Sequence, residues 1–132
     1  MYRVIIADDD NQTAQFFGGL FDERLFKIKA VGSSWDLFAE IAASGPPHIL
    51  ITEIHLIDIS VDELIRCLKR KCPASLIIIV TNDTSKETSA RVRTQDVPIF
   101  YFGLKPLDTD EMKHVVSDAV LMLTNCKRAA GS

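Results

Sequence analysis

One stretch decides the fold of this 132-residue chain: His48-Ile49-Leu50-Ile51-Thr52-Glu53-Ile54-His55-Leu56. It is a short, nearly unbroken apolar run after Gly45-Pro46-Pro47, and such a run is typical of a parallel strand covered on both faces. Its acidic residue, Glu53, stands near the end of the run. Ligands in open α/β sheets bind outside the carboxyl ends of the strands, so this carboxylate is a candidate functional group. The alternative interpretation is an ordinary solvated glutamate at a strand end.

Four other strand-like runs lie on either side of this stretch, at residues 4–7, 25–31, 76–80 and 98–102. Each of the five runs is followed by a segment with helical periodicity. Regular alternation with short connections predicts a parallel sheet with helices on both faces. The longest apolar runs are the first, third and fourth, which suits central strands. We therefore predict a single (βα)5 flavodoxin-like domain, with a five-stranded parallel sheet of order 2-1-3-4-5.

Capping residues and apolar stripes mark the five expected helices. The first should be capped by Asn11, the second by Ser33 or Ser34, and the last by the segment 108–111; capping-box spacing also places starts at 60–63 and 84–87. The fourth helix is poor in large apolar residues and should be weakly anchored. The expected apolar faces of the second and last helices are Trp35, Leu37, Phe38, Ile41 and Ala42, and Met112, Val115, Val116, Ala119, Leu121, Met122 and Leu123.

Composition and charge narrow the class of protein. The chain is 47% hydrophobic and 25% charged, as in ordinary soluble domains, and its net charge of −3 gives no electrostatic reason to bind nucleic acid. No apolar run reaches the roughly 18 residues of a membrane span, and no signal peptide follows Met1, so we expect a cytoplasmic location and no membrane partner.

The cysteines and the C-terminus carry no recognisable motif. Cys67, Cys72 and Cys126 lack C-x-x-C spacing and are interpreted as reduced thiols. Apolar periodicity is lost after residue 126. We assign residues 1–126 to the domain and residues 127–132 to a flexible tail, the start of a linker or a cloning remnant.

Acidic, hydroxyl and basic side chains follow four of the five strands. In the predicted sheet the strand ends meet at one edge, which brings together Asp8 and Asp9, Glu53, Thr81, and Lys105. Carboxylates placed this close repel one another, and a hard divalent cation compensates them; all-oxygen ligands favour Mg²⁺.

This ordered set resembles the receiver domain of two-component response regulators. The resemblance covers residues 3 to about 126, and it depends on the combination of motifs rather than on any single one. It implies that Asp8 and Asp9 hold a weakly bound Mg²⁺, together with Glu53 and the backbone carbonyl of His55. It also implies a phosphoacceptor at position 53, with Thr81 and Lys105 as the phosphate contacts and Phe102 as the aromatic switch residue.

The same resemblance implies partners. A histidine kinase or another signalling protein is the expected partner, and a C-terminal output domain beyond this segment is expected. A homodimer through the fourth helix, fifth strand and fifth helix is a further expectation, in which residues such as Arg91, Arg93, Asp110 and Asp118 would pair across a two-fold axis.

Two departures from the receiver pattern stand out. Glu53 replaces the usual aspartate and sets its carboxylate one methylene further out, which disturbs the in-line geometry of phosphoryl transfer. A glutamate also resembles a phosphorylated aspartate in length and partly in charge. The loop that follows is atypical as well, with Ile57 in place of a proline and Ser60-Val61 in place of Asp-Gly.

The sequence thus leaves three functions open. The leading one is a non-enzymatic, atypical receiver, or pseudo-receiver, that acts by protein contact without ordinary phosphorylation. The second is a working receiver of a phosphorelay that takes phosphate on Glu53 or on a neighbour such as Asp58. The remote third is a cofactor-binding flavodoxin-like domain, because Glu53-x-His55-x-x-Asp58 partly matches a cobalamin-binding loop. A zinc site is disfavoured because the three histidines lack ligand spacing.

Overall fold

The computed structural model describes the backbone of residues 1–131 and the side chains of residues 1–125. Strands and helices alternate along the chain. The strands are β1 (Tyr2–Ala7), β2 (Phe26–Val31), β3 (Ile49–Glu53), β4 (Leu76–Thr81) and β5 (Ile99–Leu104). The helices are α1 (Asn11–Gly18), α2 (Ser34–Ser44), α3 (Val61–Lys71), α4 (Lys86–Thr94) and α5 (Thr109–Gly131).

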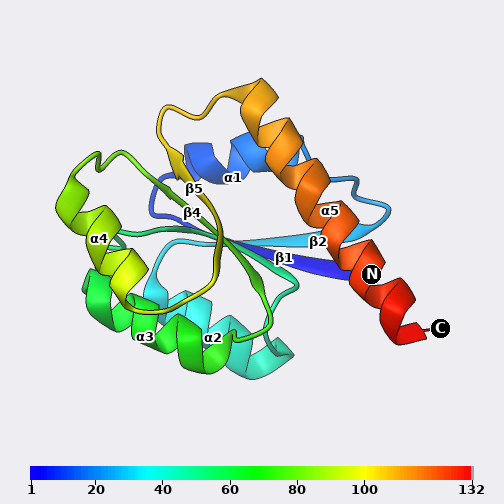
Figure 1. Ribbon diagram of the computed structural model, residues 1–132, viewed down its shortest axis with the longest axis horizontal. Coiled ribbons are helices and arrows are strands. Elements are labelled where there is room, and N and C mark those ends of the chain that lie inside the picture. The colour runs from blue at the N-terminus through cyan, green and yellow to red at the C-terminus, as the bar shows by residue number, and fades with distance from the viewer. Residues whose placement is uncertain (132) are drawn as a thin grey trace.

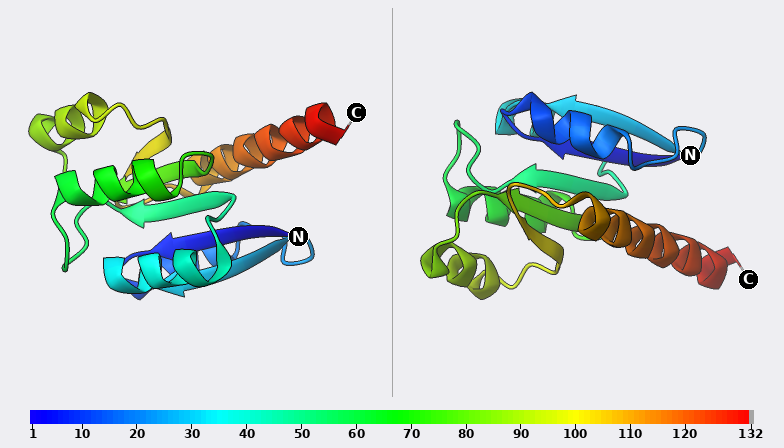
Figure 2. Two further views of the ribbon diagram at one scale, coloured as in Figure 1. Left: turned by 90° about the horizontal axis from the view of Figure 1, so that it is seen from below. Right: turned by 90° about the horizontal axis from the view of Figure 1, so that it is seen from above.

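All five strands are parallel and form one sheet of order β2-β1-β3-β4-β5, which confirms the predicted flavodoxin-like topology. Figures 1 and 2 show the sheet between two helical layers, with α1 and α5 on one face and α2, α3 and α4 on the other. The strands with the longest apolar runs take the three central positions, as burial on both faces requires.

Period-two alternation divides the central strands between two cores. One set of their side chains packs with α2, α3 and α4 and comprises Ile5, Ala7, Leu50, Ile77 and Ile79. The other set packs with α1 and α5 and comprises Val4, Ile6, Ile49, Ile51, Ile78 and Val80. Because neighbouring side chains on a strand point to opposite faces, an apolar residue at every position fills both cores at once.

A β-bulge interrupts this alternation in β5. Ile77 pairs with Ile99, but the next residue, Ile78, pairs with Tyr101, so that Phe100 is an extra residue. Phe100 and Tyr101 therefore pack on the α1 and α5 side, whereas Phe102 packs with the core on the α4 side. The bulge decides which aromatic ring of β5 faces α4.

Side-chain caps confirm most of the predicted helix starts. Ser33, Ser60 and Asp108 each accept a hydrogen bond from an amide of the first turn that follows. Two positions were wrong by one residue. Asp10 rather than Asn11 caps α1, and Ser85, the second residue of the predicted box, caps α4.

Four sequence predictions of burial differ from the structure, among them that of Ala42 on α2, which is exposed. Trp35 was placed on the apolar face of α2, but its residue exposure is 79%. Leu121 and Met122 of α5 are exposed as well. Cys67 and Cys72 are buried free thiols, as expected, whereas the side chain of Cys126 lies outside the described residues.

The C-terminal helix is longer than expected. The backbone of α5 is helical to Gly131, five residues past the predicted boundary at 126, and its last turns run beyond the sheet (Figure 2). Ser132 lies outside the described residues. The division of the chain into a domain and a tail or linker stays a prediction.

Helix α4 is weakly anchored, as its composition predicts. Only Thr88 and Val92 of its nine residues are buried, and the sheet below it ends at the edge strand β5.

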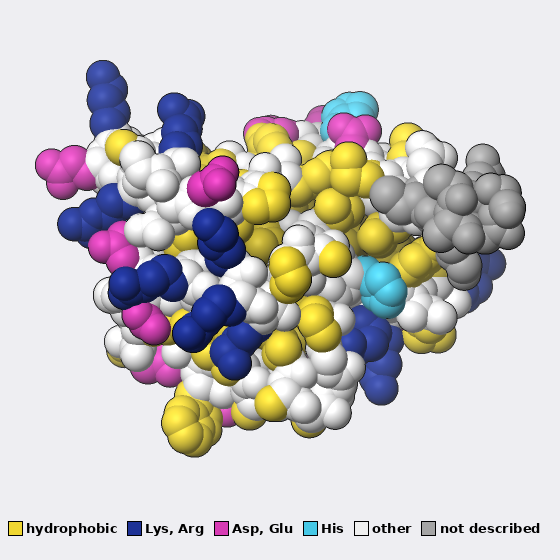
Figure 3. Space-filling model, turned by 60° about the horizontal axis from the view of Figure 1, so that its bottom comes forward, with side chains coloured by type: hydrophobic (Ala, Val, Ile, Leu, Met, Phe, Trp, Pro, Cys, Tyr) yellow, Lys and Arg dark blue, Asp and Glu magenta, His cyan; other side chains and the backbone are white. Residues whose placement is uncertain are grey.

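Among the described residues, no helix is long and apolar enough to cross a membrane. Figure 3 shows Lys and Arg side chains concentrated over the part of the surface where α3 and α4 lie.

One arginine ties β1 to the end of α2. The Nη1 group of Arg3 donates to the carbonyl oxygens of Ser44, Gly45 and Pro46, at 2.9, 3.1 and 3.2 Å. These carbonyls lie where a helix end leaves acceptors without intrahelical donors. We expect Arg3→Met to lower the free energy of unfolding by about 1–2 kcal/mol, because a charged donor is lost from three carbonyl acceptors, and one of these hydrogen bonds is part-buried.

The measurement is urea unfolding followed by circular dichroism. Arg24→Met is the matched control, because Arg24 forms only an exposed pair with Asp22 and should change stability little. Equal losses in the two variants would contradict the assigned role of Arg3.

Candidate functional site

Four strand ends meet at one edge of the sheet and carry the candidate residues. Asp8 follows β1, Glu53 ends β3, Thr81 ends β4 and Lys105 follows β5. Their closeness follows from the parallel register: the amide of Lys105 donates to the carbonyl oxygen of Thr81 at 2.8 Å. The edge predicted from sequence therefore exists, and three of its side chains are in direct contact.

The ammonium group of Lys105 lies between two buried carboxylates. Its Nζ atom is 2.7 Å from Oδ2 of Asp8 and 2.9 Å from Oε2 of Glu53. Side-chain exposure is 19% for Lys105, 2% for Asp8 and 7% for Glu53. Ion pairs this well shielded from water are far less screened than surface pairs. The Glu53 side chain thus reaches Lys105, the residue that the resemblance to receiver domains implies as a phosphate contact.

Asp8 is held in its ionised form. Burial alone would raise the pKa of its carboxyl group, but hydrogen bonds from Lys105 and Thr13 outweigh burial, and the pKa of Asp8 is lowered. Its Oδ2 atom accepts from the Thr13 hydroxyl at 2.6 Å, and its Oδ1 atom accepts from the amide of Asp10 at 2.9 Å. Thr13, on α1, is a site residue that sequence reasoning missed, because no motif points to it.

The same contacts set the charge states of Lys105 and Asp9. Burial lowers the pKa of an ammonium group, yet the two carboxylates dominate and the pKa of Lys105 is raised. Asp9 projects into solvent, and the neighbouring Asp8 carboxylate, partial burial and the more distant Glu53 together raise its pKa. The nearby carboxylates thus make the ionised form of Asp9 less favourable.

The carboxylate oxygens of Asp8 and Glu53 are all engaged. The remaining oxygen of Glu53, Oε1, accepts from the backbone amide of His55 at 3.2 Å. Among the residues whose side chains the structure describes, no three His, Cys, Asp or Glu groups are arranged to hold a metal ion. Two of the four predicted Mg²⁺ ligands, Asp8 and Glu53, contact the Lys105 ammonium, and the Mg²⁺ site stays a prediction.

Thr81 and Phe102 lie next to this cluster and not inside it. Thr81 is fully buried, and its Oγ1 atom accepts from the amide of Asp83 at 3.1 Å. Phe102 is half-buried and packs with the α4-side core, where it also lines a surface cavity. Their predicted roles as phosphate contact and switch residue stay predictions.

The side chain of His55 makes a second connection that sequence reasoning missed. Its Nε2 atom lies 2.7 Å from Oδ2 of Asp83, which also accepts from the Thr88 hydroxyl at 2.6 Å. The amide of Ser85 donates to Oδ1 of Asp83 at 2.8 Å. The hydrogen bond from Thr88, then those from Ser85 and His55, hold the pKa of Asp83 far below its usual value. The loop after β3 is thereby joined to the start of α4.

Asp58, the alternative phosphoacceptor, is engaged elsewhere. Its two carboxylate oxygens accept from the backbone amides of Ser34 and Trp35 at 2.9 and 3.1 Å, so it caps α2 from a distant loop. The hydrogen bond from the Ser34 amide is the main cause of its lowered pKa. Asp58 lies in the loop, as expected, and neighbouring Ile57 is 82% exposed.

The comparisons with known proteins identify the fold. No protein-family model and no curated protein matches the sequence. The structure is similar to the signal receiver domain of an HD domain-containing protein from Pseudomonas fluorescens Pf-5, with a TM-score of 0.81 and 15% identity over 96% of this chain and 92% of that chain.

Two further solved structures agree. One is the signal receiver domain of a putative Luxo repressor protein from Vibrio parahaemolyticus, with a TM-score of 0.80 and 19% identity over 99% of this chain and 98% of that chain. The other is a CheY-like response regulator receiver domain from Methanospirillum hungatei JF-1, with a TM-score of 0.76 and 17% identity over 95% and 98% of the two chains. The chain therefore has the receiver-domain fold.

The position of Lys105 generates a prediction about metal binding. In Lys105→Met, a neutral side chain of similar length leaves the carboxylates of Asp8 and Glu53 uncompensated, so divalent cations should bind more tightly than to the wild type. Calorimetric titration with Mg²⁺ and Mn²⁺ measures this, with Lys113→Met, at an exposed position of α5, as the control. Equal affinity in the wild type and Lys105→Met would contradict it.

Proposed function

We propose that this chain is an atypical receiver domain: a non-enzymatic signalling module that acts through protein contacts and does not take phosphate in the ordinary way. The observation that carries the proposal is the contact between Glu53 and Lys105, made by a glutamate at the position where receivers have the phosphoacceptor aspartate. The receiver fold supports the class of function, and the pair supports the departure from it.

The geometry around Glu53 opposes phosphoryl transfer. An attacking carboxylate oxygen must point at the phosphorus atom in line with the leaving group, and catalysis of this reaction is almost entirely positioning. In this chain one Glu53 oxygen faces Lys105 and the other accepts the His55 amide. Phosphorylation would have to break both contacts inside a site that is largely closed to water.

The same pair supports a constitutive active-like state. In a working receiver, as the resemblance implies, the lysine contacts the phosphoryl group on the aspartate. Here the longer side chain of Glu53 places its own carboxylate against Lys105. This carboxylate carries a charge of −1, whereas a phosphoryl group carries about −1.5 to −2. The imitation would therefore be incomplete in charge and in acceptor oxygens.

The remaining expectations concern partners and location. We propose a signalling protein as the partner, either a histidine kinase or a protein that reads the receiver surface, and an output domain beyond this segment. The surface of α4, β5 and α5 is the candidate for a homodimer. We also propose a cytoplasmic location and no direct binding of nucleic acid. Mg²⁺ held by Asp8, Asp9, Glu53 and the His55 carbonyl would require the Lys105 ammonium to move away from the two carboxylates that it contacts.

Mass spectrometry of the intact protein tests phosphate acceptance. After incubation with acetyl phosphate and Mg²⁺, the wild type should show no stable gain of a phosphoryl group, because Glu53 is misplaced and engaged. Glu53→Asp shortens the side chain and should gain one, since Thr81 and Lys105 remain in place. Stoichiometric phosphorylation of wild-type Glu53 would overturn the proposal and favour the second candidate, a working phosphorelay receiver.

Glu53→Gln tests the energetic weight of the pair. The neutral amide leaves the buried Lys105 ammonium with one carboxylate instead of two, and the free energy of unfolding should fall by about 1–3 kcal/mol. Glu63→Gln, which removes an exposed pair with Arg66, should cost only about 0–1 kcal/mol. If Glu53→Gln were as stable as the wild type and had the same oligomeric state, the Glu53–Lys105 pair would not hold the domain in an active-like state.

A further inference from the structure

A cavity lies between α4 and the edge strand β5, outside the carboxylate cluster. Its volume is about 680 Å³, within the usual range of small-molecule sites. The strand β5 is the edge strand of the sheet, and Figure 1 shows the short helix α4 at that side of the molecule.

One face of α4 lines the cavity with polar and cationic side chains. Lys86, Ser89 and Arg93 are spaced three and four residues apart, so they lie on the same side of the helix. A helix that packs firmly on a sheet would place large apolar residues on such a face. The opposite wall is apolar and comes from Phe102 and Leu104 of β5. The cavity therefore combines cations and hydroxyl groups with an aromatic and aliphatic wall.

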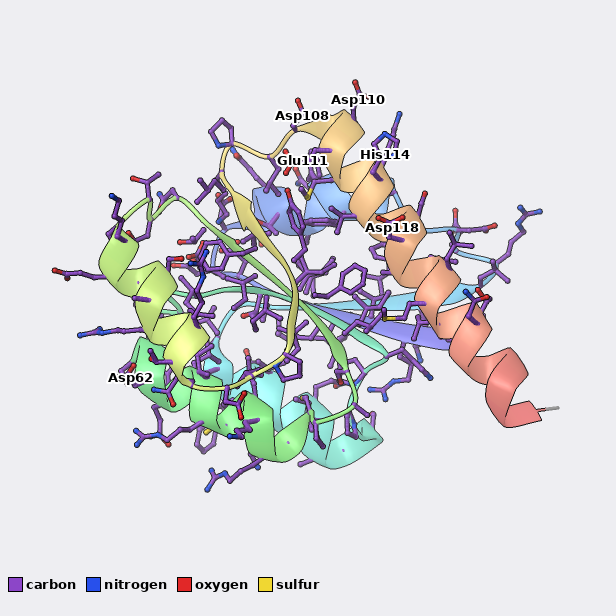
Figure 4. All side chains as sticks on the ribbon, viewed as in Figure 1. Asp62, Asp108, Asp110, Glu111, His114 and Asp118 are labelled. Atoms are coloured by element: carbon purple, nitrogen blue, oxygen red, sulfur yellow. The ribbon has the colours of Figure 1, made fainter. Side chains whose placement is uncertain are left out.

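The two cations have no acidic partner within the part of the chain whose side chains are described. Neither Lys86 nor Arg93 forms an ion pair there. The one acidic residue that lines the cavity, Asp83, already accepts from His55, Thr88 and Ser85. Figure 4 shows the acidic side chains labelled on α5 projecting from that helix, which covers the other face of the sheet.

The helices around the cavity carry an excess of positive charge, the same sign as Lys86 and Arg93. Helices α3 and α4 carry seven of the fifteen Lys and Arg residues of a chain whose net charge is −3. Figure 3 shows these basic side chains gathered over one part of the surface. Such a concentration raises the local abundance of anions and speeds their arrival.

We propose that this cavity binds a small organic anion, with its carboxylate or phosphate group against Lys86 and Arg93 and its apolar or aromatic body against Phe102 and Leu104. Charge-assisted hydrogen bonds to Arg and Lys hold the anionic group, and the β5 wall removes the apolar body from water. Neither half of the cavity alone would select this ligand, because the cations accept any anion and the wall accepts any apolar group.

A ligand in this cavity would act on the elements that join α4 to the carboxylate cluster. It would contact Phe102 directly and lie beside Asp83, whose bond to His55 leads to the loop after Glu53. The cavity is therefore a candidate input site for a domain that does not accept phosphate. The ligand site itself stands on the cavity and does not depend on that proposed function.

The probe for the test is anilinonaphthalene sulfonate, an aromatic anion that fluoresces when its rings leave water. Its neutral analogue, N-phenylnaphthylamine, lacks the anionic group and serves as the matched ligand control. The variants Lys86→Gln and Arg93→Gln remove one cation each. The control variant Arg91→Gln removes an exposed cation of α4 that does not line the cavity. Circular dichroism confirms that each variant is folded.

We expect the sulfonate to bind the wild type and Arg91→Gln equally, and Arg93→Gln and Lys86→Gln about tenfold more weakly, because each loses a charge-assisted contact. The neutral analogue should bind weakly and equally to all four proteins. Amide chemical shifts should move at Ser89, Arg93 and Leu104 on addition of the sulfonate.

The proposal would be overturned by no binding of the sulfonate, by equal weakening in Arg91→Gln, or by shift changes centred away from α4 and β5. None of these bears on phosphate acceptance by Glu53, which the mass measurement decides separately. Binding of the neutral analogue that matches the sulfonate would likewise overturn it, because the cavity would then select apolar bulk without regard to charge.

Discussion

The ammonium of Lys105, held between the carboxylates of Asp8 and Glu53, is the interaction on which the candidate site depends. Three charges withdrawn from water are costly unless each is paired and hydrogen-bonded. Here Thr13, the Asp10 amide and the His55 amide complete the set. The result is an electrostatic unit that joins the ends of β1, β3 and β5.

The fold of the chain and the chemistry of this edge depend on different features. The receiver-domain fold brings carboxylates, a threonine and a lysine to one edge because parallel strands end there, whatever reaction follows. Whether the edge accepts phosphate depends on the positions of individual atoms, and in this chain the carboxylate at position 53 contacts Lys105. The same residue types at the same strand ends can therefore support different chemistry.

The features predictable from sequence are those set by strand periodicity and order. Apolar runs such as Leu76–Val80 predict where the strands lie. Residues that follow these runs, such as Asp8 and Lys105, are therefore predicted to lie at the carboxyl ends of the strands. The contact of His55 with Asp83 was not predictable, because it depends on how two loops approach each other. The exposure of Trp35 was missed because helical spacing predicts a face, whereas burial depends on what packs against it.

The cap that Asp58 provides for α2 has a consequence for how the chain folds. Its carboxylate satisfies the first amides of a helix that starts 24 residues earlier in the chain. Alone, α2 is an eleven-residue helix, a length that is marginal in water, and it would also lack these two hydrogen bonds. Its N-terminus is complete only after β3 has joined the sheet and the following loop has closed. Helix α2 and the loop beside Glu53 should therefore form and melt as one cooperative unit.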